Sequence, residues 1–464
     1  MTETPIQADY LVVGAGAAGM AFADQLLTDS AATIAIVDRR HRPGGHWNDA
    51  YPFVRLHQPS SNYGVNSRQL GSGGKDTAGF NAGLDELASG AEVVSYFENV
   101  LQQRLLPSGR VRFFPMSEYT EDGMVESRLS GARRPVSVGK VVDATCYSPK
   151  IPATNPPQYA VADGLIFAPI NDLPRLARPG ASYTVIGAGK TGMDACLWLL
   201  QNGAEADRIR WIVPRDSWML DRANFQTGPG TLVTTLRYLA DEVEAIVEAD
   251  SVDDVFLRLE AKGALLRLDP AVTPRLHHCA TVTRGELAAL RQIAKIVRLG
   301  RVQRIERDRI VLDHGEVPTD DATIHIDCSA SAIVHPEKRP VFEPGRINLQ
   351  CLRLCQPVFS AALIGHVEAA NADDGQKNAL CQPMDYPSDP LGWLRMMSQE
   401  LPARIRWAQH PDIAAFNAAC RLDSVAPRAA QLQPGDTAEL AEIDRLEANI
   451  GPAIEKLQIL LATA

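Results

Sequence analysis

The chain has 464 residues, which is enough for roughly two or three domains and a large buried core. Its composition, 45% hydrophobic and 22% charged, excludes a collagen, a coiled coil and a wholly disordered chain. The formal charge is −10, from 46 basic and 56 acidic side chains. Because an acidic surface repels phosphate backbones, we expect no nucleic-acid partner.

The eight cysteines are scattered along the chain without a Cys-x-x-Cys pair, which argues against a redox dithiol and a zinc site. We expect them to be reduced, buried thiols of a cytoplasmic protein. The run His277-His278-Cys279 contains metal-ligand residue types, but adjacent side chains rarely converge on one ion. A solvated loop without metal is therefore expected there. No run of ~20 apolar residues and no signal peptide is found, so no membrane association is expected.

The first motif with chemical content is a glycine-rich turn between a predicted strand, residues 8–13, and a predicted helix, residues 20–27. It has the spacing Gly-x-Gly-x-x-Gly, and a second strand, residues 33–37, ends at an acid. In such a βαβ unit the turn admits a dinucleotide pyrophosphate to the helix N-terminus, and the acid accepts hydrogen bonds from ribose. The residues predicted to bind this cofactor are Gly14, Gly16, Ala17, Ala18, Gly19, Asp38 and Arg39.

A second Gly-x-Gly-x-x-Gly turn follows a predicted strand, residues 183–186, and precedes a predicted helix, residues 193–201. The next strand, residues 209–213, ends without an acid, and Arg215 followed by Asp216 takes that place. An arginine fork pairs with the 2′-phosphate of NADPH, so we expect NADPH here, with an ordinary exposed arginine as the alternative. The residues predicted to bind it are Gly187, Gly189, Lys190, Thr191, Gly192 and Arg215.

Two such motifs indicate either an internal duplication or two different dinucleotides, and their different charges favour FAD at the first and NADPH at the second. The predicted fold class is α/β, with two dinucleotide-binding Rossmann-like domains. The FAD domain is expected to be discontinuous, residues 1–170 and 320–464, and to be interrupted by the NADPH domain, residues 171–319. A helical insertion is predicted at about 228–300, where it forms a lid, a homodimer surface or solvated helices.

Further segments lie near these motifs. Downstream of Asp38 the chain reads Gly44-Gly45-His46-Trp47, then Tyr51-Pro52-Phe53-Val54-Arg55-Leu56-His57. A later strand ends in Asp143-Ala144-Thr145-Cys146, and Arg215 opens an Arg-x-x-Trp-x-x-x-Arg run. Together with both glycine motifs, these segments resemble flavin-containing monooxygenases and Baeyer–Villiger monooxygenases over residues 8–225, with a looser match after residue 320. The chain differs from both groups at residues 164–173, which lack their linker histidine and final aromatic residue.

The resemblance implies roles for several residues at the flavin. Arg55 would stabilise negative charge on the reduced flavin, with a structural salt bridge as the alternative. His57 would hold a flavin edge or shuttle a proton near neutral pH, with a buried core histidine as the alternative. Gln58 would contact the flavin or the substrate, or stabilise its loop. The other residues implied to lie at the cofactor are Gly45, His46, Trp47, Ala144 and Thr145.

The function predicted from these features is that of an NADPH-dependent FAD monooxygenase. FAD would be reduced by NADPH and would react with O2, so that one oxygen atom enters a small organic substrate by hydroxylation, N-oxidation or Baeyer–Villiger oxidation. One alternative is an NAD(P)H-dependent flavin reductase or oxidase without oxygen transfer, which the missing linker histidine motivates. Another is a non-catalytic flavin-binding protein.

Overall fold

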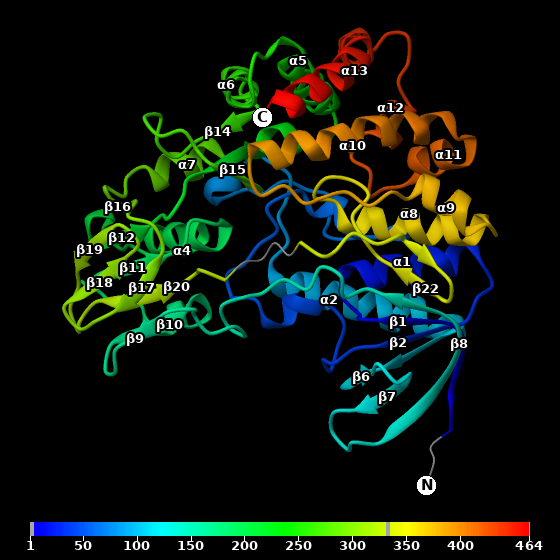
Figure 1. Ribbon diagram of the computed structural model, residues 1–464, viewed down its shortest axis with the longest axis horizontal. Helices are drawn as coiled ribbons and strands as arrows, with labels where there is room; N and C mark the ends of the chain where they lie inside the picture. Colours follow the sequence, from blue (N-terminus) through cyan, green and yellow to red (C-terminus); the bar gives the residue numbers. More distant parts are fainter. Residues whose placement is uncertain (1–3, 331–334, 464) are drawn as a thin grey trace.

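The computed structural model describes residues 4–330 and 335–463. Two β-sheets, one mainly parallel and one wholly parallel, form its framework, and a group of helices lies above them in the view of Figure 1. The predicted α/β class with two Rossmann-like sheets is confirmed. Among the described helices, none has the length and apolar character needed to cross a membrane.

The first sheet is built from both ends of the chain. Its strands are β1 (Ile6–Val13), β2 (Ile34–Val37), β5 (Val111–Phe114), β6 (Ser117–Tyr119), β7 (Met124–Ser127), β8 (Arg133–Asp143), β21 (Phe342–Glu343) and β22 (Arg346–Asn348). The order is β21-β22-β8-β1-β2-β5, with β1, β2, β5, β8 and β22 parallel and the hairpin of β6 and β7 attached to β8. The helices of this unit are α1 (Ala17–Asp29), α2 (Gly90–Val100), α8 (Pro357–Ala370) and α9 (Asp374–Leu380). α1 and α8 pack against each other (Figure 1). A small hairpin of β3 (Gly64–Val65) and β4 (Arg68–Gln69) contacts α1.

The second sheet is formed by the middle of the chain. Its parallel strands are β10 (Ile166–Pro169), β11 (Tyr183–Ile186), β12 (Ile209–Ile212), β16 (Lys295–Val297) and β20 (Ile324–Asp327), in the order β10-β20-β11-β12-β16. The helices beside it are α3 (Leu173–Leu176), α4 (Lys190–Gln201) and α7 (Arg284–Leu290). A smaller sheet contains β9 (Ala160–Val161), β17 (Val302–Ile305), β18 (Arg309–Leu312) and β19 (Gly315–Pro318).

The predicted domain limits at residues 170 and 320 differ from the membership of the two sheets. β10 lies before residue 170 and β20 lies after residue 320, yet β20 pairs with both β10 and β11 in the second sheet. The chain rejoins the first sheet only at β21 and β22. A buried strand has no sequence feature that tells which of two sheets it joins. The predicted limits therefore assign β10 and β20 to the wrong sheet.

The inserted segment at 228–300 is not helical throughout. It contains α5 (Leu232–Glu248), α6 (Val252–Ala261) and α7, but also β14 (Leu265–Leu266), β15 (Leu276–Val282) and β16. β14 and β15 flank β13 (Ser217–Asp221) in a three-stranded sheet. α7 begins with a capping box, in which Thr283 and Glu286 each bind the other's backbone N–H, and it ends at Leu290.

The inserted helices are covered by the end of the chain. The C-terminal helices are α10 (Pro390–Gln409), α11 (Pro411–Ala419), α12 (Ala426–Ala429) and α13 (Thr437–Thr463). α13 packs along α5 (Figure 1). Arg445 of α13 forms ion pairs with Asp241 and Glu244 of α5. α5 is therefore a packed wall of the molecule rather than a solvated helix.

Candidate cofactor and active site

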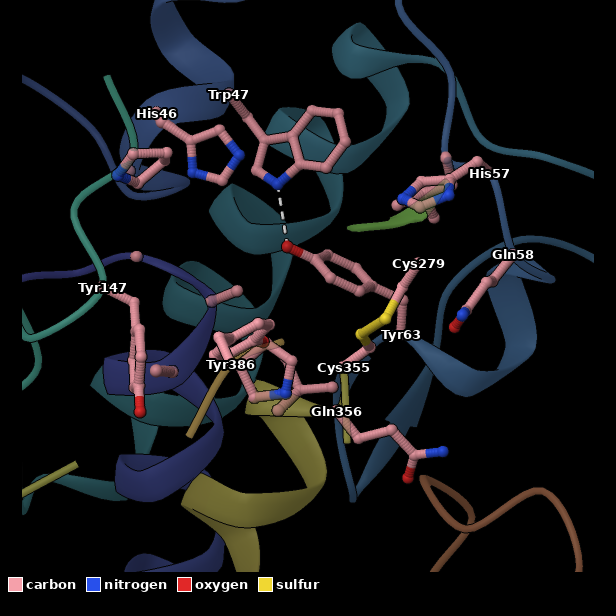
Figure 2. Close-up of a pocket in the computed structure, with 18 of the residues that line it drawn as sticks. His46, Trp47, His57, Gln58, Tyr63, Tyr147, Cys279, Cys355, Gln356 and Tyr386 are labelled. Atoms are coloured by element: carbon pink, nitrogen blue, oxygen red, sulfur yellow. Dashed lines mark hydrogen bonds between the residues drawn. A yellow bond between two sulfur atoms is a disulfide. The ribbon is translucent and has the colours of Figure 1, made fainter. Parts of the chain in front are cut away.

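A cavity of about 970 Å³ lies where the carboxyl ends of β1, β2 and β8 meet the first turn of α4, the segment before α8, and α5. The carboxyl ends of parallel strands are where α/β sheets bind ligands. Figure 2 shows part of this cavity, in which aromatic side chains surround a disulfide. The predicted residues in its wall are Gly14, Gly16, Ala17, Ala18, Asp38, Arg39, Gly45, His46, Trp47, Arg55, His57, Gln58, Ala144, Thr145, Lys190 and Thr191.

The first glycine turn has the backbone shape of a pyrophosphate cradle. Gly14 has φ of +105°, which L side chains rarely adopt, and a Cβ on Gly19 would lie 2.0 Å from the Gly14 carbonyl oxygen. Gly16 is the N-cap of α1, and no side chain caps that helix. The free N–H groups of the first turn of α1 are therefore available to an anion.

The acid at the end of β2 is held in place by the backbone. Both carboxylate oxygens of the buried Asp38 accept hydrogen bonds, Oδ2 from the Ala15 N–H (2.7 Å) and Oδ1 from the Arg40 N–H (2.7 Å). Asp38 also faces the cavity, where the second lone pair of each oxygen can accept from ribose hydroxyls. Arg39 is exposed at the rim.

The Gly44-Gly45-His46-Trp47 run forms a wall of this cradle. A Cβ on Gly45 would lie 2.9 Å from the Gly16 Cα, so the turn packs directly on the cradle. His46 stacks on Trp47 at 5.2 Å between ring centroids, and Trp47 Nε1 donates to the Tyr63 hydroxyl at 2.8 Å (Figure 2). Burial, with Arg40 nearby, lowers the pKa of His46 to about 4, so this ring is neutral near pH 7.

The second glycine turn repeats the first. Gly187 has φ of +125°, and a Cβ on Gly192 would lie 2.0 Å from the Gly187 carbonyl oxygen. Gly189 is the N-cap of α4, which again has no side-chain cap. Lys190 Nζ pairs with Asp194, whose Oδ2 accepts a hydrogen bond from the Tyr51 hydroxyl at 2.6 Å, so the first unit contacts the start of α4.

Arg215 follows the end of β12 and does not line the cavity. Gly187, Gly189 and Gly192 do not line it either. Its side chain is exposed. The adjacent Asp216 is buried and bound at both oxygens by Arg298, at 2.9 and 3.0 Å. Because Arg298 compensates this carboxylate, Asp216 opposes an anion at Arg215 less than the sequence suggested.

Arg55 is placed differently from its predicted catalytic role. Its side chain is 57% exposed, Nη1 donates to the Leu87 carbonyl at 3.0 Å, and Asp76 lies at 3.8 Å. This arrangement matches the structural alternative, an anchor between two loops at the rim of the cavity. Gln58, Ala144 and Thr145 lie in the wall as expected, and Thr145 Oγ1 donates to Asp143 at 2.6 Å.

His57 is neutral rather than a proton shuttle near pH 7. Burial is the largest cause, and the positive charges of Lys190 and Arg222 add to it, so that its pKa falls to about 3. The Thr281 N–H donates to His57 Nδ1 at 3.3 Å, which places the ring proton on Nε2. His57 therefore offers the cavity a fixed hydrogen-bond donor.

The buried Arg222 connects the His57 loop to the insertion. Nε donates to the His57 carbonyl (3.1 Å), Nη1 to Asn81 Oδ1 (3.1 Å) and Nη2 to the Thr281 carbonyl (3.1 Å). Nη2 also lies 2.9 Å from the Glu286 carboxylate. The last arginine of the Arg-x-x-Trp-x-x-x-Arg run is thus a positioning residue, because it orients the backbone that carries His57.

α5 contributes to the cavity, which was not predicted from the sequence. Thr235, Tyr238, Leu239 and Glu242 line it, and the Tyr238 hydroxyl donates to Glu242 Oε1 at 2.5 Å. Burial raises the pKa of Glu242 to about 7. Only the spacing of these four side chains on one helical face could have signalled a shared surface, and amphipathic helices show that spacing wherever they pack.

The cysteines also differ from the expectation of reduced thiols. Cys279 of β15 and Cys355, which precedes α8, form a disulfide in the cavity wall, and the other six cysteines are free. The two partners are 76 residues apart, and a pairing of this kind cannot be deduced from spacing.

The His277-His278-Cys279 run lies on β15 and not in a solvated loop. His277 is 1% exposed, and its ring packs edge-on against Phe256 and Trp393. Neither of its ring nitrogens has a hydrogen-bond partner among the described residues. Among those residues no cluster of three or more metal-ligand side chains occurs.

This buried ring predicts a loss of stability in acid. Burial lowers the pKa of His277 from 6.5 to about 3, so the unfolded chain binds a proton that the folded chain excludes. The stabilising contribution is complete above pH 6.5 and is lost as the pH falls, by up to about 1.4 kcal/mol per pH unit. Between pH 7 and pH 5, the free energy of unfolding should fall by about 2 kcal/mol less in His277→Phe than in the wild type, as measured by urea denaturation. His314 is exposed, so His314→Gln should show the same pH dependence as the wild type. If the free energy of unfolding of His277→Phe falls with pH as steeply as that of the wild type, the proposed role of His277 is contradicted.

Comparison with known proteins places the chain among relatives. Residues 12–66 match the family described as NAD(P)-binding Rossmann-like domain. A solved structure, an oxidized steroid monooxygenase bound to NADP, is similar with a TM-score of 0.49 and 17% identity, over 78% of this chain and 85% of that one. Uncharacterized protein Rv2000 of Mycobacterium tuberculosis and uncharacterized protein Mb2023 of Mycobacterium bovis are each 46% identical over 460 residues, 99% of this chain and 85% of theirs. The chain therefore belongs to the same protein family as these two mycobacterial proteins.

Proposed function

We propose that the protein is an NADPH-dependent FAD monooxygenase that transfers one oxygen atom from O2 to a small organic substrate. The observation that carries the proposal is that a single cavity is lined by residues of both glycine turns, Gly14 and Gly16 of the first and Lys190 and Thr191 of the second. Two dinucleotides held at these turns would meet inside one enclosed space, as hydride transfer between them requires.

The residues present fit both cofactors. The uncapped helices α1 and α4 each begin at a glycine with no side chain in front of the first turn, which suits a pyrophosphate. Asp38 at the first turn suits the ribose of FAD, whereas Arg215 at the second suits the 2′-phosphate of NADPH. We propose that the cofactor domains follow the two sheets, with residues 159–330 as the NADPH domain and the flanking segments as the FAD domain.

Bound FAD would accept a hydride from NADPH and, once reduced, would react with O2. The chain's own residues orient and enclose that chemistry. The Nε2–H of His57 can donate to an acceptor in the cavity, and the ring carries no charge above about pH 3. Trp47, Tyr63 and His46 form an aromatic wall that limits the entry of water (Figure 2). Glu242, with its pKa of about 7, can give or take a proton at the α5 side.

The test is reduction and reoxidation of the purified, flavin-loaded protein. Anaerobic NADPH should bleach the flavin. Under ¹⁸O2, a panel of a ketone, a tertiary amine and a thioether should give labelled product from at least one of them. Flavin that is reduced but yields stoichiometric peroxide with every probe would contradict monooxygenation, and flavin that NADPH does not bleach would contradict the NADPH site.

A flavin reductase or oxidase without oxygen transfer is the second candidate. The linker histidine is missing from residues 164–173, and Arg55 donates to a loop carbonyl at the cavity rim. Both observations favour a cavity that is less suited to oxygen transfer. Peroxide release in the preceding experiment would support this function.

The nicotinamide preference is predicted to depend on Arg215. We expect Arg215→Ala to raise the KM for NADPH about 10- to 100-fold, because a charge-assisted hydrogen bond to the 2′-phosphate is lost, and to leave the KM for NADH nearly unchanged. Steady-state flavin reduction with each nucleotide measures this. Arg208→Ala, which removes an exposed arginine of the same unit paired with Glu205, is the matched control. If Arg215→Ala changes the KM for NADPH and the KM for NADH equally, Arg215 does not bind the 2′-phosphate.

A further inference from the structure

The Cys279–Cys355 disulfide lies at a junction of the molecule. Cys279 belongs to β15 of the inserted segment, and Cys355 precedes α8 of the first unit. Both line the cavity that the two glycine turns share, and Figure 2 shows the bond between Tyr63 and Gln356. Cys279 is 3% exposed, whereas Cys355 is partly exposed, so one sulfur is the accessible member of the pair.

The backbone at both cysteines is in a sparsely populated conformation. Cys279 has φ of +54° and Cys355 has φ of +51°, and Met116 is the only other non-glycine residue with positive φ in the described ranges. A side chain in this region strains the backbone by about 1–3 kcal/mol, and such strain gathers at functional sites. Its presence at both ends of one bond indicates that the pair serves more than cross-linking.

The start of α8 favours a thiolate on Cys355. Cys355 directly precedes Gln356, the N-cap of this 14-residue helix, and no side chain caps its first turn. The positive end of a helix dipole stabilises a nearby thiolate. By contrast, burial raises the pKa of each of the six free cysteines. They are Cys146, Cys196, Cys328, Cys351, Cys381 and Cys420. Cys355 is therefore the cysteine suited to thiol–disulfide exchange.

We propose that Cys279 and Cys355 form a redox-active pair that takes two electrons from the reduced flavin and passes them to a small-molecule disulfide. In the first step NADPH, through the flavin, supplies two electrons and a proton, and one further proton comes from solvent. The S–S bond breaks, two thiols form and NADP⁺ is released. In the second step the Cys355 thiolate attacks the small disulfide and expels one thiol. Cys279 then attacks the mixed disulfide, expels the second thiol and restores the protein bond. This inference rests on the NADPH and FAD sites of the proposed function but not on oxygen transfer.

The first experiment counts electrons and thiols. Flavin-loaded protein is titrated with NADPH without oxygen, quenched with iodoacetamide and mapped by mass spectrometry. We expect two equivalents of NADPH per flavin and alkylation of Cys279 and Cys355 only after NADPH is added. The double variant Cys279→Ser/Cys355→Ser should need one equivalent. Cys146→Ser, which removes a free thiol from the end of β8, should behave as the wild type.

The thiol map of the wild type decides the question even if the double variant does not fold. A flavin bleached by one equivalent with the disulfide intact would overturn the proposal, and so would a pair that is already alkylated before NADPH is added. Failure of the nicotinamide site is distinguishable, because photoreduction of the flavin should still open the disulfide. Protein that holds no flavin would overturn both proposals.

The second experiment supplies the oxidant. Hydroxyethyl disulfide, a small uncharged probe, is added without oxygen to the NADPH-reduced protein. The bond between Cys279 and Cys355 should re-form, with two thiols released per chain. Cys279→Ser should instead stop at a mixed disulfide on Cys355, whose added mass identifies it. If Cys279 and Cys355 stay reduced in the presence of this probe, the proposed exchange with a small-molecule disulfide is contradicted.

Discussion

Gly189→Val is expected to leave a protein that holds its flavin but is no longer reduced by NADPH at ordinary concentrations. Gly189 has φ of −74° and ψ of 179°, which any L residue adopts, and nothing lies within 4 Å of a Cβ placed there. The fold should therefore tolerate the substitution. The branched side chain would occupy the space in front of α4 that a pyrophosphate needs, which weakens NADPH binding by about 10- to 100-fold or more.

Gly16→Val is the matched variant at the first turn. Gly16 has φ of −74° and ψ of −178°, and its added Cβ would meet only the Gly45 Cα, at 3.7 Å. We expect this protein to be folded but colourless. Circular dichroism, flavin content after gel filtration and anaerobic reduction by NADPH measure the three properties. Loss of flavin from the Gly189 variant with retention in the Gly16 variant would reverse the cofactor assignment.

Arg222→Met is expected to be the most destabilising single change near the cavity, where the Arg222 side chain holds the carbonyl of the lining residue His57. The guanidinium is fully buried. Its removal takes an ion-pair partner from Glu286 and a hydrogen-bond donor from the carbonyls of His57 and Thr281. Breaking a buried pair from one side is destabilising by about 3–5 kcal/mol. Urea denaturation followed by tryptophan fluorescence measures the loss. Flavin retention should fall as well, because the same side chain orients the His57 loop.

Two comparisons test the origin of this effect. Arg208→Ala breaks an exposed pair with Glu205 and should change stability by less than about 1 kcal/mol. Adding Glu286→Gln to Arg222→Met should recover part of the loss, because the unpaired carboxylate is then neutral. Equal destabilisation by Arg222→Met and Arg208→Ala would show that the buried network contributes little.

Local sequence patterns predicted the backbone geometry of both glycine turns. The positive φ of Gly14 and Gly187, and the close contact that only glycine permits at positions 19 and 192, follow from a spacing that is readable in the chain. The capping box at Thr283 was equally readable, because it depends on two residues three positions apart. The glycine turns and the capping box depend on residues that lie only a few positions apart in the chain.

Predictions about electrostatics were less successful, since charge states depend on distant neighbours. Three roles were open to His57: a flavin contact, a proton shuttle near neutral pH, or a buried core histidine. Burial and the charges of Lys190 and Arg222 hold its pKa at about 3, which disfavours the proton shuttle. Arg55 had the residue type for a catalytic cation, but its guanidinium donates to Leu87 at the rim. The buried arginine near the site is Arg222, and only packing distinguishes the two.

The sequence by itself determined the α/β class, the backbone shape of both glycine turns and the charge difference between Asp38 and Arg215. These follow from chain-local geometry and residue chemistry. Only the tertiary structure decided that residues of both turns line one cavity, that α5 forms part of its wall, and that Cys279 joins Cys355 across 76 residues. The physical reason is that long-range contacts depend on how two sheets and a helical layer pack, which no short stretch of sequence specifies.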